Sequence, residues 1–227
     1  MNGDILKDQI DLAWQWTEKQ QRALDSGEIT EEEWFQRHNE YFTVSYLSKD
    51  NPRAQSGHSG NEHRWRYARE IILNAVHKSG SFLDIGCANG HLIESLVKWI
   101  EPQYDIEFYG LDISESLINL AKKRLPHWKD RFYLGNALYW IPSYKFDFVR
   151  TGLEYVPIGR EKGYLCHIMA NYLNPGGRLI VGTYNEVISS DEVESKVASW
   201  GFNIGESYSR LKPGSEIVAY RMLWIEN

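Results

Sequence analysis

The sequence predicts an α/β domain of three layers, in which helices cover both faces of a mainly parallel β-sheet. Short apolar runs alternate with amphipathic segments over most of the chain, which is the pattern of strand-helix-strand units. Two of the apolar runs end in an acid, at Asp84 and at Asp112, and a glycine-containing turn follows the first. These acids also predict where a ligand binds, because open α/β sheets bind ligands at the carboxyl ends of their strands.

The N-terminal residues 1–47 are expected to form helices rich in aromatic side chains that pack over the main domain. Ser26-Gly27-Glu28 interrupts the first helical segment, and Thr30 with Glu33 has the spacing of a capping box that begins a second helix. The aromatic side chains either line a pocket or belong to the core, and the core is the commoner place for such stripes.

A loop over residues 50–61 follows, rich in turn formers and poor in apolar residues. It leads into a helix expected at 62–78, so it can reach the ligand site. In one hypothesis the loop is a lid that excludes water, and in the other it is a plain connection. The residues of such a lid are Gln55, Ser56 and His58, with Gly57 and Gly60 as hinges.

Residues 81–92 predict a strand, a tight turn and the start of a helix. Gly86 and Gly90 take positive φ readily, and the free N–H groups of the next helix carry partial positive charge, so the turn can cradle a ligand. Glycine is also common in turns that bind nothing. The next strand ends in Asp112, roughly twenty residues further on, where a carboxylate that binds ribose hydroxyls is expected. The ligand is therefore predicted to contain a nucleoside.

Further strands are expected at 131–134, 146–150, 178–184, 202–208 and 217–225, the last two as a closing antiparallel pair. The helices between them are expected at 114–125, 160–173 and 191–200. Ser114 begins the first of these helices and Pro126 stops it. The turn at 174–177 ends the second helix with a residue at positive φ and introduces a buried strand.

A dinucleotide-binding turn needs three glycines, and here Ala88 and His91 replace the second and the third, which argues against a pyrophosphate ligand. The stretches Leu-Asp-Ile-Gly-Cys-Ala-Asn-Gly and Gly-Leu-Asp-Ile-Ser instead resemble the first two motifs of class I S-adenosylmethionine-dependent methyltransferases. Phe-Asp-x-Val at 146–149 and Leu-Asn-Pro-Gly-Gly-Arg-Leu at 173–179 are similar to later elements of that family. The resemblance covers about residues 62–227.

The resemblance implies a Rossmann-like, seven-stranded methyltransferase sheet whose last strand is antiparallel. It divides the chain into a helical cap with its lid loop, residues 1–61, and an S-adenosylmethionine-binding domain, residues 62–227. Asp84 would hold the amine of the methionyl group, Asp112 the ribose, and Asn136 the adenine, although the family often has an acid at that last position. The expected cofactor contacts are Asp84, Gly86, Cys87, Ala88, Asn89, Gly90, Leu92, Asp112, Ile113, Asn136, Ala137, Leu138, Arg150, Thr151 and Gly152.

The expected reaction is direct in-line transfer of the methyl group to an oxygen or nitrogen of a small-molecule acceptor, leaving S-adenosylhomocysteine. Such a transfer needs mainly proximity, orientation and removal of one proton. Candidates for the base are His58, His63, Glu154 and Tyr155. Asp147 is expected to have a structural role.

Other readings stay open. The family's DNA-methylating motifs do not follow the fourth strand, so DNA is not expected as the acceptor, whereas an RNA or protein acceptor would be supported by the arginines at 64, 66 and 69. Such a charged stripe is more often the solvated side of a helix. A nicotinamide oxidoreductase would share the fold, and a non-catalytic module could retain the nucleoside pocket.

Composition limits the remaining choices. The 227 residues carry a net charge of −6, which argues against a broad nucleic-acid-binding face, and 42% are hydrophobic, which suffices for a buried core. The two cysteines give neither a disulfide framework nor a zinc pattern, so no metal is expected. No apolar run approaches the ~20 residues of a membrane span. We expect a cytoplasmic protein without membrane contact, in which a homodimer through the aromatic N-terminal segment is conceivable.

Overall fold

The computed structural model describes residues 2–58, 60–100, 103–184, 192–214, 216 and 218–227. Its centre is a seven-stranded sheet of order β3-β2-β1-β4-β5-β7-β6, in which β7 runs antiparallel to both of its neighbours. The strands are β1 (Gly80–Ile85), β2 (Ile106–Asp112), β3 (Phe132–Leu134), β4 (Phe146–Thr151), β5 (Leu173–Tyr184), β6 (Ile204–Leu211) and β7 (Val218–Glu226). The predicted Rossmann-like sheet with an antiparallel last strand is confirmed.

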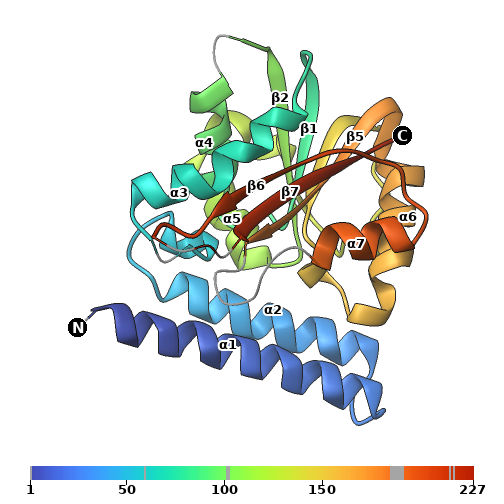
Figure 1. Ribbon diagram of the computed structural model, residues 1–227. Coiled ribbons are helices and arrows are strands. Elements are labelled where there is room, and N and C mark those ends of the chain that lie inside the picture. The colour runs from blue at the N-terminus through green and yellow to red at the C-terminus, as the bar shows by residue number, and fades with distance from the viewer. Residues whose placement is uncertain (1, 59, 101–102, 185–191, 215, 217) are drawn as a thin grey trace.

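Helices lie on both faces of this sheet (Figure 1). Side chains alternate between the faces along each strand: Phe82 of β1 packs in one buried cluster and Leu83 in the other. The first cluster includes residues of α3 (Glu62–Arg69), α4 (His91–Ile100) and α5 (Glu115–Arg124). The second includes residues of α6 (Glu161–Tyr172) and α7 (Glu192–Ser199). Two separate cores, one on each face, make the three layers.

Some predicted boundaries are wrong. The helix expected at 62–78 ends at Arg69 and continues as a 3-10 segment over Glu70–Ala75, whose tighter turns direct Ile71, Ile72 and Ala75 into the core. The sixth strand begins at Ile204, because Gly201 with φ +88° turns the chain before it. The expected first residue of the last helix, Asp191, and that of the last strand, Ile217, lie outside the described residues.

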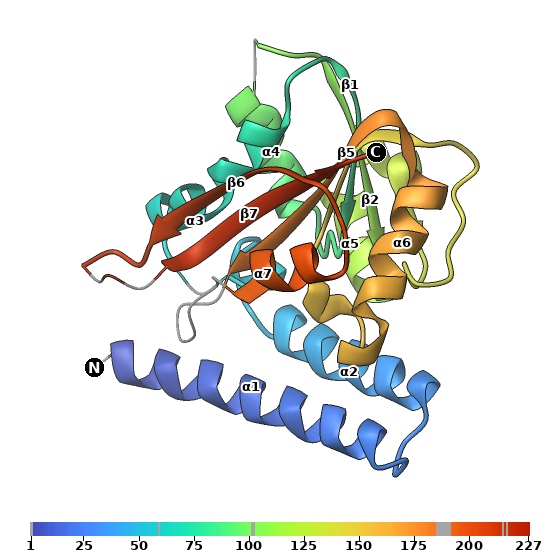
Figure 2. The same cartoon turned by 45° about the vertical axis from the view of Figure 1, so that its right-hand side comes forward.

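The N-terminal segment forms two long helices, α1 (Asn2–Asp25) and α2 (Glu31–Leu47), which run side by side in opposite directions below the sheet (Figures 1 and 2). The predicted capping box is present: Thr30 Oγ1 accepts from the Glu33 N–H at 3.2 Å, and the Glu33 carboxylate accepts from the Thr30 N–H at 2.7 Å. Trp34 and Phe35 of α2 are buried in the same cluster as α6. The two helices therefore belong to the packed body of the protein.

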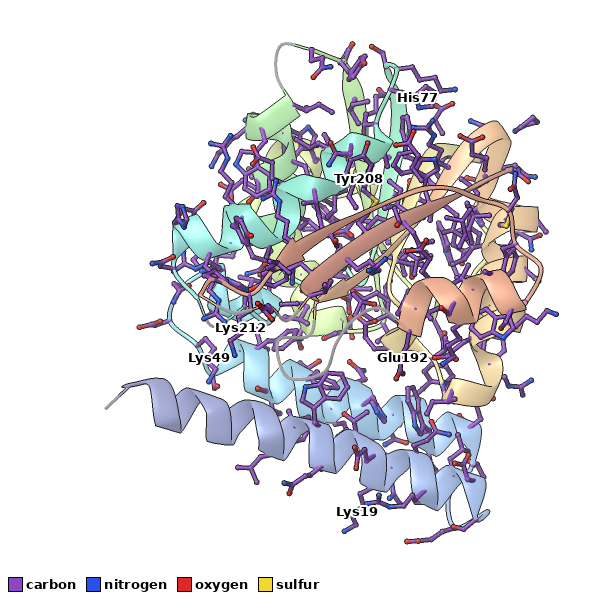
Figure 3. All side chains as sticks on the ribbon, in the orientation of Figure 1. Lys19, Lys49, His77, Glu192, Tyr208 and Lys212 are labelled. Carbon is purple, nitrogen blue, oxygen red and sulfur yellow. The ribbon has the colours of Figure 1, made fainter. Side chains whose placement is uncertain are left out.

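These helices cover the carboxyl ends of the strands. His77, just before β1, lies at the opposite end of the molecule from α1 and α2 (Figure 3), so β1 runs toward them. The hydroxyl groups of Thr43 in α2 and Ser114 at the start of α5 are 2.7 Å apart. At the other end of α2, Glu31 pairs with Arg160. Contacts at both ends thus hold α2 over the strand edge where a ligand is expected.

Candidate active site

The turn after β1 has the positive φ that the sequence predicted for its two glycines. Gly86 and Gly90 have φ of +71° and +77°. Ala88 between them has φ +46° and is the one non-glycine residue with positive φ in the described part of the chain. Its N–H donates to Asp112 Oδ2 at 2.8 Å, so the end of β2 holds the turn in this conformation.

The Asp112 carboxylate accepts a backbone hydrogen bond on each oxygen. Oδ1 accepts from the Ser114 N–H at 2.8 Å, and Oδ2 accepts from Ala88. Burial raises the pKa of Asp112 to about 6, against the opposing effect of these hydrogen bonds. A carboxylate oxygen has two acceptor positions, so Asp112 can take two further donors.

Asp84 and Arg150 form a buried ion pair on the adjacent strands β1 and β4. Asp84 Oδ1 accepts from the Arg150 guanidinium at 3.1 Å, and the two side chains are 1% and 5% exposed. The same guanidinium nitrogen donates to the Tyr155 hydroxyl at 3.0 Å. Burial raises the pKa of Asp84, although Arg150 opposes it. Asp84 Oδ2 is buried and has no hydrogen-bond partner in the described part of the structure.

These groups form the floor of a cavity of about 440 Å³ between the strand ends and the N-terminal helices. Most of the residues predicted from the sequence line it. They are Asp84, Gly86, Cys87, Ala88, Leu92, Asp112, Ile113, Asn136, Ala137, Arg150, Glu154 and Tyr155.

Five expected cofactor contacts do not line the cavity: Asn89, Gly90, Leu138, Thr151 and Gly152. Asn89 is buried and instead supports the turn, because its amide donates to Pro52 O at 2.9 Å and its oxygen accepts from the His91 N–H at 3.1 Å. Thr151, the last residue of β4, is fully buried, and its hydroxyl lies 2.6 Å from that of Tyr164 in α6.

Neither candidate histidine lines the cavity. His58 is buried and packs edge-on against Trp65, with ring centroids 5.3 Å apart, and burial lowers its pKa to about 3. His63 is exposed on α3. The loop that bears His58 does reach the cavity through Ser56 and Gly57, and because Gly57 has no Cβ, its backbone passes close to the Tyr46 hydroxyl. Gln55 points elsewhere, and its side-chain amide donates to Lys49 O at 2.9 Å.

The acid and the tyrosine after β4 do line the cavity. The Glu154 carboxylate turns back over Gly152, and the surrounding protein raises its pKa by desolvation. The Tyr155 ring covers Gly86 so closely that a Cβ there would lie 2.6 Å from it. Asp147, by contrast, pairs with Lys78 at 2.9 Å and accepts from the Ser81 N–H, which confirms its structural role.

Asn136 lies where the third strand ends. Its side-chain oxygen accepts from the Leu138 N–H at 3.0 Å, which closes a turn and fixes the orientation of the amide. The amide N–H groups and the second acceptor position of that oxygen stay available at the cavity wall.

Two further parts of the lining lie outside the site residues named from the sequence, although a pocket lined by the aromatic side chains of residues 1–47 was one of the two expectations for that segment. The first is Arg69 of α3, whose guanidinium stacks on Trp65 at 5.1 Å. The second part is the cavity side of α1 and α2, here named the cap wall. Its residues are Ala13, Trp14, Thr17, Trp34, Phe35, His38, Asn39, Phe42, Thr43 and Tyr46.

Within the described residues, no three His, Cys, Asp or Glu side chains are grouped in a way that could hold a metal ion. No helix in this part of the chain has the length and apolar character needed to cross a bilayer.

Residues 76–220 match the protein family described as "Methyltransferase domain". This match spans more than half of the chain, and the chain belongs to this family of class I S-adenosylmethionine-dependent methyltransferase domains. Trans-aconitate 2-methyltransferase from Acidovorax ebreus (strain TPSY) is 29% identical over 119 residues, which are 52% of this chain and 44% of that protein. The match thus spans less than half the length of this relative.

Two solved structures are similar in fold. N-methyltransferase NodS from Bradyrhizobium japonicum WM9, in complex with S-adenosylhomocysteine, has a TM-score of 0.63 at 16% identity and covers 83% of this chain and 97% of its own. The 1,6-didemethyltoxoflavin-N1-methyltransferase of Burkholderia thailandensis has a TM-score of 0.65 at 14% identity. The match covers 88% of this chain and 91% of that protein's chain. At these identities the likeness shows the fold alone.

Proposed function

We propose that this protein is an S-adenosylmethionine-dependent methyltransferase that acts on a small-molecule acceptor enclosed beneath its N-terminal cap. The observation that carries the proposal is a single cavity with two different sides: a floor with buried carboxylates and a glycine turn, and the aromatic cap wall. Family membership supports the floor as the cofactor site. The cap, residues 1–61 in this proposal, supplies the acceptor side.

The floor offers each chemical group of the cofactor a suitable partner. The unpartnered Asp84 Oδ2 is an acceptor for the methionyl ammonium group, and Arg69 is a cation for its carboxylate. Asp112 has acceptor positions for both ribose hydroxyls. Asn136 and Ala137 lie where the adenine amino group and ring would reach the wall. The buried, orphaned oxygen of Asp84 is the feature that such a ligand satisfies best.

The cofactor supplies a methyl group made electrophilic by the sulfonium. The protein's part is to position the acceptor, exclude water and take up one proton. Glu154 is the best-placed base, because it lines the cavity and its raised pKa makes it a better proton acceptor near neutral pH. Tyr155 is held by Arg150 and covers the turn, so its contribution is orientation.

A small acceptor fits better than a polymer. The cavity lies beneath α1 and α2, and a polymer would have to pass these packed helices. The arginines that favoured an RNA or protein acceptor are dispersed: Arg66 pairs with Glu70, and Arg69 turns into the cavity. Two of the relatives, trans-aconitate 2-methyltransferase and the 1,6-didemethyltoxoflavin methyltransferase, are also named for small-molecule acceptors.

A direct test uses S-adenosylmethionine with a labelled methyl group. The protein is incubated with the donor and, in separate reactions, with a low-mass metabolite extract, total tRNA and a protein extract. We expect a labelled product that chromatography separates from the donor to form from the low-mass extract with the wild type, and no such product to form with Asp112→Ala. Label that appears in the RNA or protein fraction instead would contradict the proposed acceptor class.

A further inference from the structure

The charges of the cavity are segregated. Among the described lining residues, each side chain with a formal charge lies on the floor: Arg69, Asp84, Asp112, Arg150 and Glu154. The cap wall provides rings and neutral polar groups, and it includes two titratable side chains, His38 and Tyr46. Whether the cap wall is neutral depends on these two groups.

His38 is neutral near pH 7 and presents an acceptor. Its Nδ1 lies 2.8 Å from Trp34 O, and a carbonyl oxygen only accepts, so Nδ1 bears the proton. Nε2 is then a lone-pair acceptor, and it is buried without a hydrogen-bond partner in the described part of the chain. His38 is 8% exposed, and burial lowers its pKa to about 4. Since burial also raises the pKa of Tyr46 to about 12, both groups are uncharged at physiological pH.

The aromatic side chains of the cap wall are held by one another. The His38 ring stacks on Trp34 with centroids 3.6 Å apart, and both are buried, whereas Phe42 and Tyr46 are half-buried with ring centroids 6.0 Å apart. The half-buried rings of Phe42 and Tyr46 and the partly exposed ring of Trp14 present flat apolar surfaces that a flat ring can contact, with little further loss of side-chain freedom. An anion against this wall would lose its hydration and meet no cation there, which makes its transfer costly.

We infer that the methyl acceptor is an uncharged, flat, aromatic or heteroaromatic small molecule that packs against the cap wall and donates an N–H or O–H to His38 Nε2. This inference rests on the proposed function, because the floor must hold the cofactor for the cap wall to face the acceptor. It excludes polycarboxylates as acceptors. Neutral polar side chains of the cap wall, such as Asn39 and Thr17, contact the substituents of the bound ring and so contribute to specificity.

The test compares matched ligands in isothermal titrations of the full chain saturated with S-adenosylhomocysteine. The pairs are quinolin-4-ol with its 2-carboxylate and lumazine with its 6-carboxylate, and trans-aconitate is the polyanion. We expect each neutral ring to bind at least about tenfold more tightly than its carboxylate, a difference of about 1.4 kcal/mol. Equal or tighter binding of the carboxylates, tightest binding of trans-aconitate, or no binding of either neutral ring at millimolar concentration would overturn the inference.

Two variants assign the binding to the cap wall. Trp14→Ala removes a partly exposed ring of the wall and should weaken quinolin-4-ol binding about fivefold or more, whereas Trp99→Ala, a tryptophan of α4 outside the cavity lining, should leave it unchanged. His38→Phe keeps a ring and removes the acceptor, so it should weaken quinolin-4-ol but not quinoline, which has no donor. Equal effects of Trp14→Ala and Trp99→Ala, or of His38→Phe on both ligands, would contradict the assignment.

The cofactor serves as the internal control. If S-adenosylhomocysteine binds the wild type but the neutral rings do not, the inference about the acceptor fails and the proposed cofactor site stands. If S-adenosylhomocysteine itself does not bind, the proposed function fails.

Discussion

The backbone N–H of Ala88 donates a hydrogen bond to Asp112 Oδ2 at 2.8 Å and thereby joins the first turn of the sheet to the end of the second strand. Ala88 has φ +46°, a conformation that costs an L-residue about 1–2 kcal/mol, and this bond helps to offset that cost. One carboxylate therefore shapes the turn and faces the cavity. The two sequence motifs that flank this contact act as one structural unit.

The raised pKa of Asp112 predicts a pH dependence of cofactor binding. Ribose hydroxyls donate to the ionised carboxylate, and a group with a folded pKa of about 6 becomes protonated as the pH falls below that value. The dissociation constant for S-adenosylhomocysteine should be constant above about pH 7 and should rise up to about tenfold by pH 5. Titration calorimetry across this range measures it. Asp112→Asn should bind S-adenosylhomocysteine weakly at pH 7.5, and its affinity should change less with pH, because only Asp84 would still titrate. An unchanged affinity of the wild type down to pH 5 would refute the role of Asp112.

The ion pair of Arg150 with Asp84 predicts a large loss of stability when one partner is removed. Arg150→Met leaves the Asp84 carboxylate buried without its cation and should lower the free energy of unfolding by about 3 kcal/mol or more. Asp84→Asn in the same chain removes the stranded charge, so the double variant should lose less than the two single losses combined. Urea unfolding at pH 7 measures each value. Strictly additive losses would show that the two side chains are not coupled.

Gly86 predicts a second double-variant cycle. Gly86→Ala places a side chain at φ +71° and within 2.6 Å of the Tyr155 ring, so it should lower stability by roughly 2–4 kcal/mol. Tyr155→Ala removes the clash but not the backbone strain, so the combined variant should recover about 1 kcal/mol or more of the expected sum. Thermal unfolding of the four proteins completes the cycle. No recovery would mean that Tyr155 does not cover the turn in solution.

The floor of the cavity was predictable because local sequence patterns encode it. The acids Asp84 and Asp112 each end an apolar run, and parallel strands bring such ends to one edge of the sheet. Gly86 and Gly90 were expected at positive φ because the turn between strand and helix is short, and both adopt it.

The cap wall was not predictable in the same way. His38 meets the cavity because α2 packs across the strand ends, and the helical periodicity of the sequence indicates a buried face without showing what that face covers. His58 was nominated from its place in a polar loop, yet its ring turns inward against Trp65. A useful signal was the aromatic content of residues 30–47, which include five Trp, Tyr and Phe side chains.

The most direct test of the central claim is isothermal titration of the purified protein with S-adenosylmethionine and S-adenosylhomocysteine, with NAD as the control ligand and Asp112→Ala as the control variant. We expect micromolar binding of the first two ligands, no heat from NAD, and a loss of about 100-fold or more in the variant, because two hydrogen bonds to a charged group are removed. No binding of either methyl-donor ligand by the wild type, or binding of NAD in their place, would contradict the claim that this cavity is a methyltransferase site.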